Sequence, residues 1–164
     1  MTMHSLKSVS LLRDVPYGLK LVWHDGRTDR ADLAGVVFRY KVFARLRDNP
    51  KLFRAIRLVD RGLGIEWADD MDYSAQSLRR LADEQRPMTG EELRAFEAEH
   101  GLTAADTAAV LDIGVRTVKA YRRAQRLPTP VAMAVRAMRA EPALLAAHYR
   151  PQPRRRPAEH APRA

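Results

Sequence analysis

The chain has 164 residues, of which 46% are hydrophobic and 30% charged, and it contains no cysteine. This composition is typical of a soluble globular protein with one or two small domains, and it excludes disulfides, a thiolate nucleophile and a zinc site built on cysteine. The formal net charge of +9, from 29 basic and 20 acidic residues, favours a polyanionic partner such as nucleic acid.

The sequence gives no sign of a membrane segment or a secretion signal. A membrane-spanning helix needs about 18 or more consecutive apolar residues, and no such run is present. The beginning of the chain, MTMHSLKSVSLLRD, lacks the basic segment, long apolar stretch and small-residue cleavage site of a signal peptide. We therefore expect a cytoplasmic protein without a membrane partner.

Short apolar or alternating runs broken by turn residues predict a small sheet in about the first 70 residues. In GLKLVWHDGRTDRADL, the side chains of Leu19, Leu21 and Trp23 share one face, which predicts an antiparallel hairpin. Asp25-Gly26 favours a type I′ turn there, because both central positions of that turn need a positive φ. Further strands are expected over 6–12, 55–60 and 64–67, with a short helix or loop over 42–56.

The stretch ADEQRPMTGEE is predicted to separate two domains, because Pro87 and Gly90 interrupt it and the apolar spacing is helical beyond it. Before it, Ser74 is predicted to cap a helix. We expect an α+β protein with three parts: a small β-rich domain over 1–85, an all-α domain over 86–149, and a basic Pro/Arg-rich tail over 150–164 that is disordered.

Five helices are expected in the second domain. Thr89 with Glu92 predicts a capping box for the first, which ends at Gly101. Thr103 with Asp106 caps the second helix, over about residues 104–111. The remaining three are expected from Gly114, over 131–139 and over 143–149.

The segment Asp112-Ile113-Gly114 is predicted to form a turn, because Asp tolerates a left-handed φ. In the helix that follows, Val118 and Tyr121 are spaced to face inward. Five cations without an intervening acidic residue occupy this region: Arg116, Lys119, Arg122, Arg123 and Arg126. Arg116, Lys119 and Arg123 fall on one outward stripe, which predicts an anionic partner.

The run from Leu102 to Tyr121 resembles, without a gap, the helix-turn-helix of the lambda-repressor-like (XRE) family of bacterial and phage regulators. The resemblance implies a five-helix domain whose third helix enters the major groove of double-stranded DNA, in a sequence-specific transcriptional regulator that acts as a homodimer and represses its own or a neighbouring operon. The DNA-binding residues implied are Thr103, Gly114, Val115, Arg116, Thr117, Lys119, Ala120, Arg122, Arg123 and Arg126.

Three positions depart from the pattern of that family. Ala104, Asp112 and Thr107 stand where the family usually has a Gln that contacts the DNA backbone, a turn Gly and a core Leu. These departures concern affinity and the geometry of the turn more than the fold.

The first domain resembles the small bacterial domain of unknown function 2442, through LKSVSLLRDVPYGLKLVWHDGRTDRADL, VFARLRDNPKLFRAIRLV and GIEWADDMDYSAQSLRRL. That domain occurs alone, in toxin-antitoxin-like neighbourhoods, or fused to such a helix-turn-helix. The resemblance implies an alternative function, in which the protein is an antitoxin-like or adaptor protein and its first domain binds a protein partner.

We expect neither an enzyme nor a cofactor, because no Ser-His-Asp order, phosphate-binding loop or GxGxxG motif is present. Asp69, Asp70 and Asp72 lack the Gly and Glu of a calcium loop and are interpreted as a polar loop. His24-Asp25 is assigned to the hairpin turn. The arginines of the tail, Arg154–Arg156, leave two interpretations open, a solubilising tail or a nonspecific phosphate contact.

Overall fold

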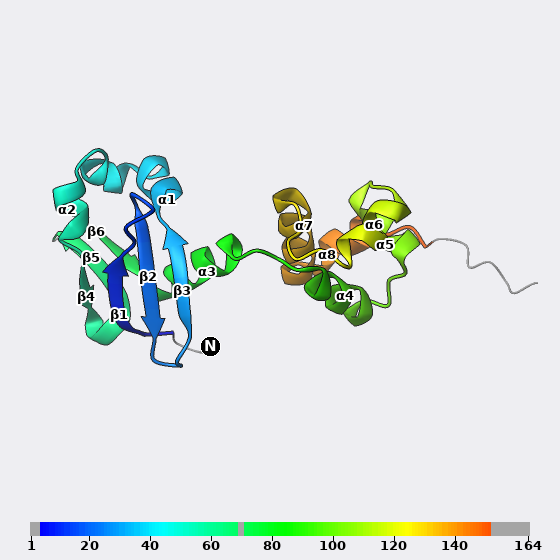
Figure 1. The fold of residues 1–164 in the computed structure, drawn as a ribbon, viewed down its shortest axis with the longest axis horizontal. Helices are drawn as coiled ribbons and strands as arrows, with labels where there is room; N and C mark the ends of the chain where they lie inside the picture. The colour runs from blue at the N-terminus through cyan, green and yellow to red at the C-terminus, as the bar shows by residue number, and fades with distance from the viewer. Residues whose placement is uncertain (1–3, 69–70, 152–164) are drawn as a thin grey trace, which may run out of the picture. The chain divides into compact units, whose positions relative to one another are not determined.

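The computed structural model describes residues 4–68 and 71–151 and contains two small antiparallel sheets followed by helices (Figure 1). The chain forms two compact units, Met1–Arg86 and Pro87–Ala164, each with its own apolar core. Asp69, Asp70 and Arg154–Arg156 lie outside the described residues. In the part of the chain that is described, no helix is long and apolar enough to span a bilayer.

The first sheet has the order β1-β2-β3 and is built from β1 (Leu6–Leu11), β2 (Gly18–Trp23) and β3 (Thr28–Asp32). The hairpin between β2 and β3 is confirmed, and Leu19, Leu21 and Trp23 are all buried. The predicted type I′ turn is wrong. Gly26 alone in this loop has a positive φ, of 85°, and its N–H donates to the Trp23 carbonyl at 3.1 Å. The Trp23 N–H donates to the Arg27 carbonyl at 2.9 Å, so the loop that this pair closes has three residues, 24–26, and ends on a glycine in the left-handed region.

A second sheet has the order β4-β5-β6, from β4 (Arg57–Val59), β5 (Gly64–Ala68) and β6 (Met71–Ser74). The prediction of a polar loop is wrong for Asp72, which lies in β6 and pairs with Glu66 of β5. Met71 in the same strand is fully buried. A four-residue strand that contains one aspartate and follows two others carries too little alternation to be recognised from sequence. Burial of Met71 in the first unit's core decides its conformation.

Short helices connect the two sheets: α1 (Ala34–Arg39), the 3-10 helix η1 (Lys41–Leu46) and α2 (Pro50–Arg54). The last two occupy the segment over 42–56 where a short helix or loop is expected, whereas α1 was not predicted. Its sequence, AGVVFR, has β-branched residues that favour a strand, but the Asp32 carboxylate accepts the Ala34 N–H at 2.9 Å and Val36 and Val37 are buried. Tertiary burial therefore overrides local preference here.

Helix α3 (Ala75–Gln85) closes the first unit. Its predicted cap is confirmed, since the Ser74 hydroxyl accepts the Ser77 N–H at 3.1 Å. The helix continues through the beginning of the stretch predicted to separate the domains. Ala82 is buried, and the Gln85 side chain accepts the Asp32 N–H and donates to the Asp32 carbonyl, both at 2.7 Å. The segment outside helices is therefore short, from Arg86 to Thr89.

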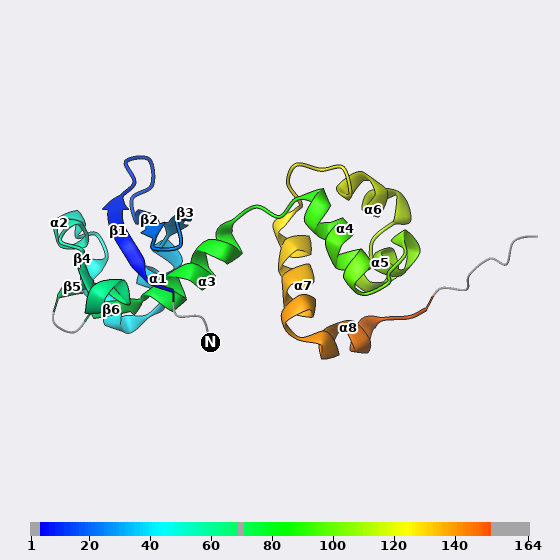
Figure 2. The same cartoon turned by 90° about the horizontal axis from the view of Figure 1, so that it is seen from below.

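Within residues 87–151, the second unit has five α-helices (Figure 2). They are α4 (Gly90–Glu99), α5 (Ala104–Leu111), α6 (Val115–Tyr121), α7 (Thr129–Ala140) and α8 (Pro142–His148). Both predicted capping boxes are confirmed. The core consists of Met88, Leu93, Phe96, Leu127, Ala132, Val135, Met138 and Leu145.

Gly90 lies in the stretch that is predicted to separate the two domains, and it also has a packing role. Its N–H donates to the Ala124 carbonyl at 2.8 Å, just beyond the end of α6. A Cβ atom at Gly90 would lie 2.3 Å from the Tyr121 carbonyl oxygen and 2.6 Å from that of Arg122. The first turn of α4 therefore contacts the backbone at the end of α6 more closely than any other residue type permits.

We expect residues 87–151 to fold without the first unit, because their apolar core is complete within this segment. The measurement is urea unfolding of that fragment, followed by circular dichroism. A single cooperative transition is the expected result. A fragment that loses helicity gradually, without a transition, would mean that the second unit depends on the first for its core.

Gly90→Ala should destabilise the second unit by about 2 to 3 kcal/mol, because two backbone carbonyls must move to admit the methyl group. Gly114→Ala is the matched control, since a Cβ there would meet only the Thr117 hydroxyl oxygen at 3.6 Å. It should cost less than about 1 kcal/mol, as expected for an exposed N-cap glycine. Equal losses of unfolding free energy in the two variants would contradict the close packing at Gly90.

Candidate nucleic-acid interface

Helices α5 and α6 are joined by a tight turn whose geometry follows from Asp112. This residue has φ 51° and ψ 47°, the left-handed conformation that the sequence predicts for it. The next N–H, of Ile113, donates to the Ala108 carbonyl at 3.0 Å and closes the end of α5. Gly114 is extended and caps α6, and Val118 is fully buried, as its spacing indicates. Buried Val118 fixes which face of α6 points outward.

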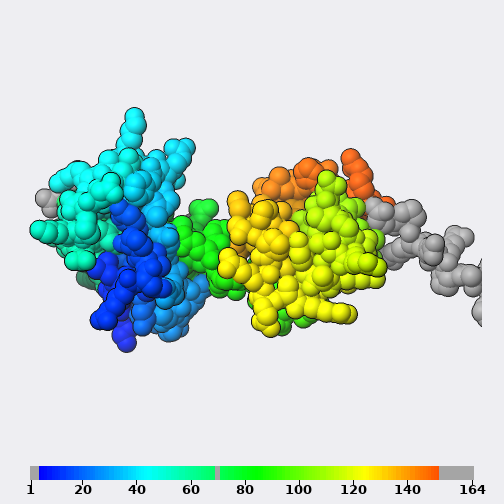
Figure 3. All heavy atoms as spheres, turned by 45° about the horizontal axis from the view of Figure 1, so that its top comes forward, coloured from blue at the N-terminus to red at the C-terminus, as the bar shows by residue number. Residues whose placement is uncertain are grey.

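The outward face of α6 and the segment after it are rich in cations. Arg116, Lys119, Arg123 and Arg126 are all exposed. None of these four has an ion-pair partner within residues 4–68 and 71–151. In the space-filling view, the segment from α6 to the beginning of α7 lies on the surface of the second unit (yellow-green to yellow, Figure 3). Together the four side chains form a basic surface without local compensation.

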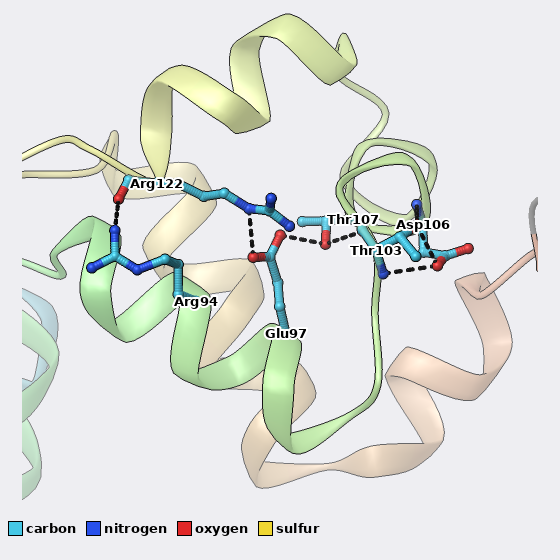
Figure 4. Close-up of polar contacts among 6 residues, drawn as sticks. All are labelled: Arg94, Glu97, Thr103, Asp106, Thr107 and Arg122. Carbon is cyan, nitrogen blue, oxygen red and sulfur yellow. Dashed lines mark hydrogen bonds and ion pairs between the residues drawn. The ribbon is translucent and has the colours of Figure 1, made fainter.

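Arg122 does not share this surface, although the sequence placed it with the other cations. Its Nε donates to Oε2 of Glu97 at 2.8 Å, and the Glu97 side chain is only 4% exposed (Figure 4). Burial of a carboxylate is costly unless it gains a charged partner and further hydrogen bonds. Arg122, unlike the other four cations, is therefore paired with a carboxylate of the interior of the second unit.

The second oxygen of the Glu97 carboxylate is also bound. The hydroxyl of Thr107, which is 1% exposed, donates to Oε1 at 2.8 Å, and its oxygen lies 3.0 Å from the Thr103 carbonyl oxygen. The hydrogen bond to Glu97 is the physical reason for a polar residue at this buried position. Glu97 on α4 thus connects α5, through Thr107, to the end of α6, through Arg122 (Figure 4).

Arg94, one turn before Glu97 on α4, contributes a second connection. Its Nη1 donates to the main-chain carbonyl of Arg122 at the end of α6 (Figure 4). A cation at a helix C-terminus interacts favourably with the helix dipole and with carbonyls that have no partner inside the helix. The carboxylate of Glu97 and the guanidinium of Arg94 therefore hold the side chain and the backbone of the same residue.

The other residues implied by the resemblance have varied surroundings. The Thr103 hydroxyl accepts the Asp106 N–H at 3.1 Å and lies 2.6 Å from the Asp106 carboxylate, so it is occupied in the capping box. Thr117 is half-buried, whereas Gly114 and Ala120 are exposed. Val115, at the start of α6, is an apolar side chain that is 40% exposed. It lies within one turn of Arg116 and Lys119.

Sequence reasoning missed the roles of Glu97, Thr107 and Arg94. One signal was available for Glu97, which falls on the apolar face of α4, four residues after Leu93. The partners could not be identified, because Thr107 and Arg122 lie 10 and 25 residues further along the chain. In the described residues, no group of three or more His, Asp or Glu side chains is placed to hold a metal ion.

Arg122→Ala and Arg123→Ala should differ in unfolding free energy, because Arg122 is paired with buried Glu97 whereas Arg123 is exposed. Loss of the Arg122 guanidinium leaves the buried Glu97 carboxylate without its cation, which should cost about 2 to 3 kcal/mol of unfolding free energy. The cost is below that of a fully buried pair because the Arg122 side chain is 30% exposed. Arg123→Ala should change stability by less than about 0.5 kcal/mol, as an exposed substitution does. Urea unfolding of both variants measures the difference, and similar values would refute the inward role of Arg122.

Comparison with known proteins gives one family match, for the first unit. No curated protein matches the chain. Among solved structures, the chain is similar to a "Putative DNA Binding Protein" from Nitrosomonas europaea, with 22% sequence identity, 94% of this chain and 96% of that chain covered, and a TM-score of 0.47. Residues 9–84 match the family described as "Protein of unknown function (DUF2442)", which confirms the resemblance of the first unit.

Proposed function

We propose that the second unit binds double-stranded DNA through α6, and that α5, the Asp112 turn and α6 act as a helix-turn-helix of the lambda-repressor-like kind. One observation carries this proposal: four exposed cations on and just after α6 have no ion-pair partner within the described residues, while the adjacent Arg122 is held inward. A surface of uncompensated positive charge on a short helix suits a polyanion.

The geometry of α6 supports binding in the major groove. That groove is about 12 Å wide and admits an α-helix. Arg116 lies in the first turn of α6, where a guanidinium can donate to O6 and N7 of guanine. Exposed Val115 beside it offers an apolar contact for a thymine methyl group, and Thr117 a hydroxyl. Ala120, which is small and exposed, allows the helix to approach closely.

Cations further along the segment suit the phosphate backbone. Lys119 and Arg123 continue the stripe of Arg116 at helical spacing, and Arg126 follows α6. Contacts from such residues fix the position of a protein on the duplex without selecting sequence. In this proposal Arg122 is a positioning residue rather than a DNA contact. Thr103 and Gly114 contribute through the beginnings of α5 and α6.

We further propose that the DNA-bound form is a homodimer and that the protein regulates transcription. A single seven-residue helix contacts only a few base pairs, whereas two copies can occupy half-sites about 34 to 36 Å apart on one face of the duplex. Two-fold symmetric binding of this kind is typical of repressors that act on their own or a neighbouring operon.

The test begins with selection of bound sequences from random duplexes by the full-length protein. The selected duplex and a scrambled one are then titrated with wild-type protein and with Arg116→Ala, at two or more salt concentrations. Arg116→Ala should weaken the selected duplex by about 1 to 3 kcal/mol and relax the preference at one base position, with little loss on the scrambled duplex. The stoichiometry on the selected duplex should be two chains.

Arg54→Ala is the matched control, because Arg54 is an exposed cation of α2 in the first unit and its removal changes the net charge equally. It should leave the preference between the duplexes unchanged. If Arg116→Ala weakens both duplexes equally, the basic surface is a nonspecific polyanion site. If it weakens neither, α6 does not contact DNA.

A further inference from the structure

The first unit carries an exposed apolar surface that its own core does not use. Phe38, Tyr40 and Val42, at the end of α1 and the start of η1, are 52%, 54% and 53% exposed. We call these three side chains the aromatic patch. In the space-filling view, this segment lies on the surface of the first unit (cyan, Figure 3). Contiguous exposed apolar patches mark protein interaction sites.

Arg47 binds the backbone that carries the aromatic patch. Its Nε donates to the Val37 carbonyl at 2.9 Å, and its Nη2 donates to the carbonyls of Phe38 and Tyr40 at 3.1 and 3.3 Å. The guanidinium also lies over the Phe38 ring, 5.8 Å from its centroid, and Tyr17 meets that ring edge-on at 88°. Rings that are fixed before binding lose little conformational entropy when a partner arrives.

Two cations alternate in sequence with the aromatic patch, and one of its side chains lines a cleft. Arg39 and Lys41 alternate with its three side chains and are exposed. Tyr40 also lines a cleft of about 320 Å³ with Tyr73, Ser77, Arg80, Leu81 and Glu84. The surface thus combines an apolar centre, a depression large enough for one side chain, and a rim on which basic groups outnumber acidic ones.

We propose that this surface is a docking site for an acidic protein segment, one that places an aromatic or aliphatic side chain in the Tyr40 cleft and carboxylates against Arg39, Lys41 and Arg80. The proposal concerns the first unit and is independent of DNA binding by the second. Aromatic side chains and arginine are the residue types enriched in protein interfaces.

The composition of the surface favours a protein over a nucleic acid. Single-stranded nucleic acid binds by stacking its bases on free aromatic faces along a basic groove. Here one face of Phe38 is covered by Arg47, and the aliphatic side chains of Val42 and Leu81 offer neither stacking nor hydrogen bonds. They do offer apolar contact area to a partner side chain.

The experiment selects a random-peptide display library on the full-length protein and synthesises the most enriched peptide with a fluorescent label. The enriched sequences should combine Asp or Glu with Phe, Trp, Leu or Ile. Titrated in solution, the labelled peptide should lose at least about tenfold in affinity for Tyr40→Ser and for Lys41→Glu. Leu63→Ser is the matched control, because Leu63 is an exposed apolar residue of the same unit (39%) outside the patch. It should bind the peptide like the wild type.

Thermal unfolding of each variant verifies that the fold is intact, and duplex titration should show unchanged DNA affinity for Tyr40→Ser. Enrichment of no acidic peptide, or equal binding by Tyr40→Ser and wild type, would overturn the proposal. A labelled oligothymidine that binds the wild type and is lost on Tyr40→Ser would assign the surface to single-stranded nucleic acid instead.

Discussion

The second unit depends on a carboxylate that is buried among its helices. Removing the Glu97 side chain from water is costly unless each of its oxygens gains a partner. Both oxygens have one: Thr107 of α5 bonds to Oε1, and Arg122 at the end of α6 bonds to Oε2, each at 2.8 Å. Because these two partners come from different helices, the requirement to satisfy one carboxylate fixes α5 and α6 against α4. The turn at Asp112 then has little freedom in how it presents α6.

The same requirement shapes the charge of the surface. Three of the glutamates that precede the basic segment are used locally: Glu92 in the cap of α4, Glu97 in the interior, and Glu99 with Arg139 of α7 at 3.2 Å. None of these carboxylates is paired with Arg116, Lys119, Arg123 or Arg126 in the described part of the chain. Residues 89–149, which contain eight basic and seven acidic residues, thereby display one face of positive charge. Segregation of charge by packing, rather than net charge, produces the surface that we propose for DNA.

An arginine also organises the proposed docking site of the first unit. Arg47 binds three carbonyls around the end of α1 and so fixes the backbone that carries the aromatic patch. Arg94 binds the end of α6 in the same manner. In both units an arginine from a neighbouring element satisfies carbonyls at a helix end, where the helix itself offers no donor. In each unit, the side chains that we propose for binding lie on or next to a short helix, and an arginine from another element donates to carbonyls at the C-terminal end of that helix.

The sequence by itself determined the features whose physical cause is local. The caps at Ser74, Thr89 and Thr103, the hairpin of β2 and β3 and the left-handed Asp112 each depend on residues within a few positions, so spacing sufficed to predict them. The tertiary structure alone decided the rest. Helix α1 and strand β6 adopt conformations that burial of Val36, Val37 and Met71 imposes, and Gly90 is required by a carbonyl more than 30 residues away. Arg122 and Arg123 are chemically identical neighbours, and only the folded position of Glu97, 25 residues earlier, sends one inward and leaves the other in solvent.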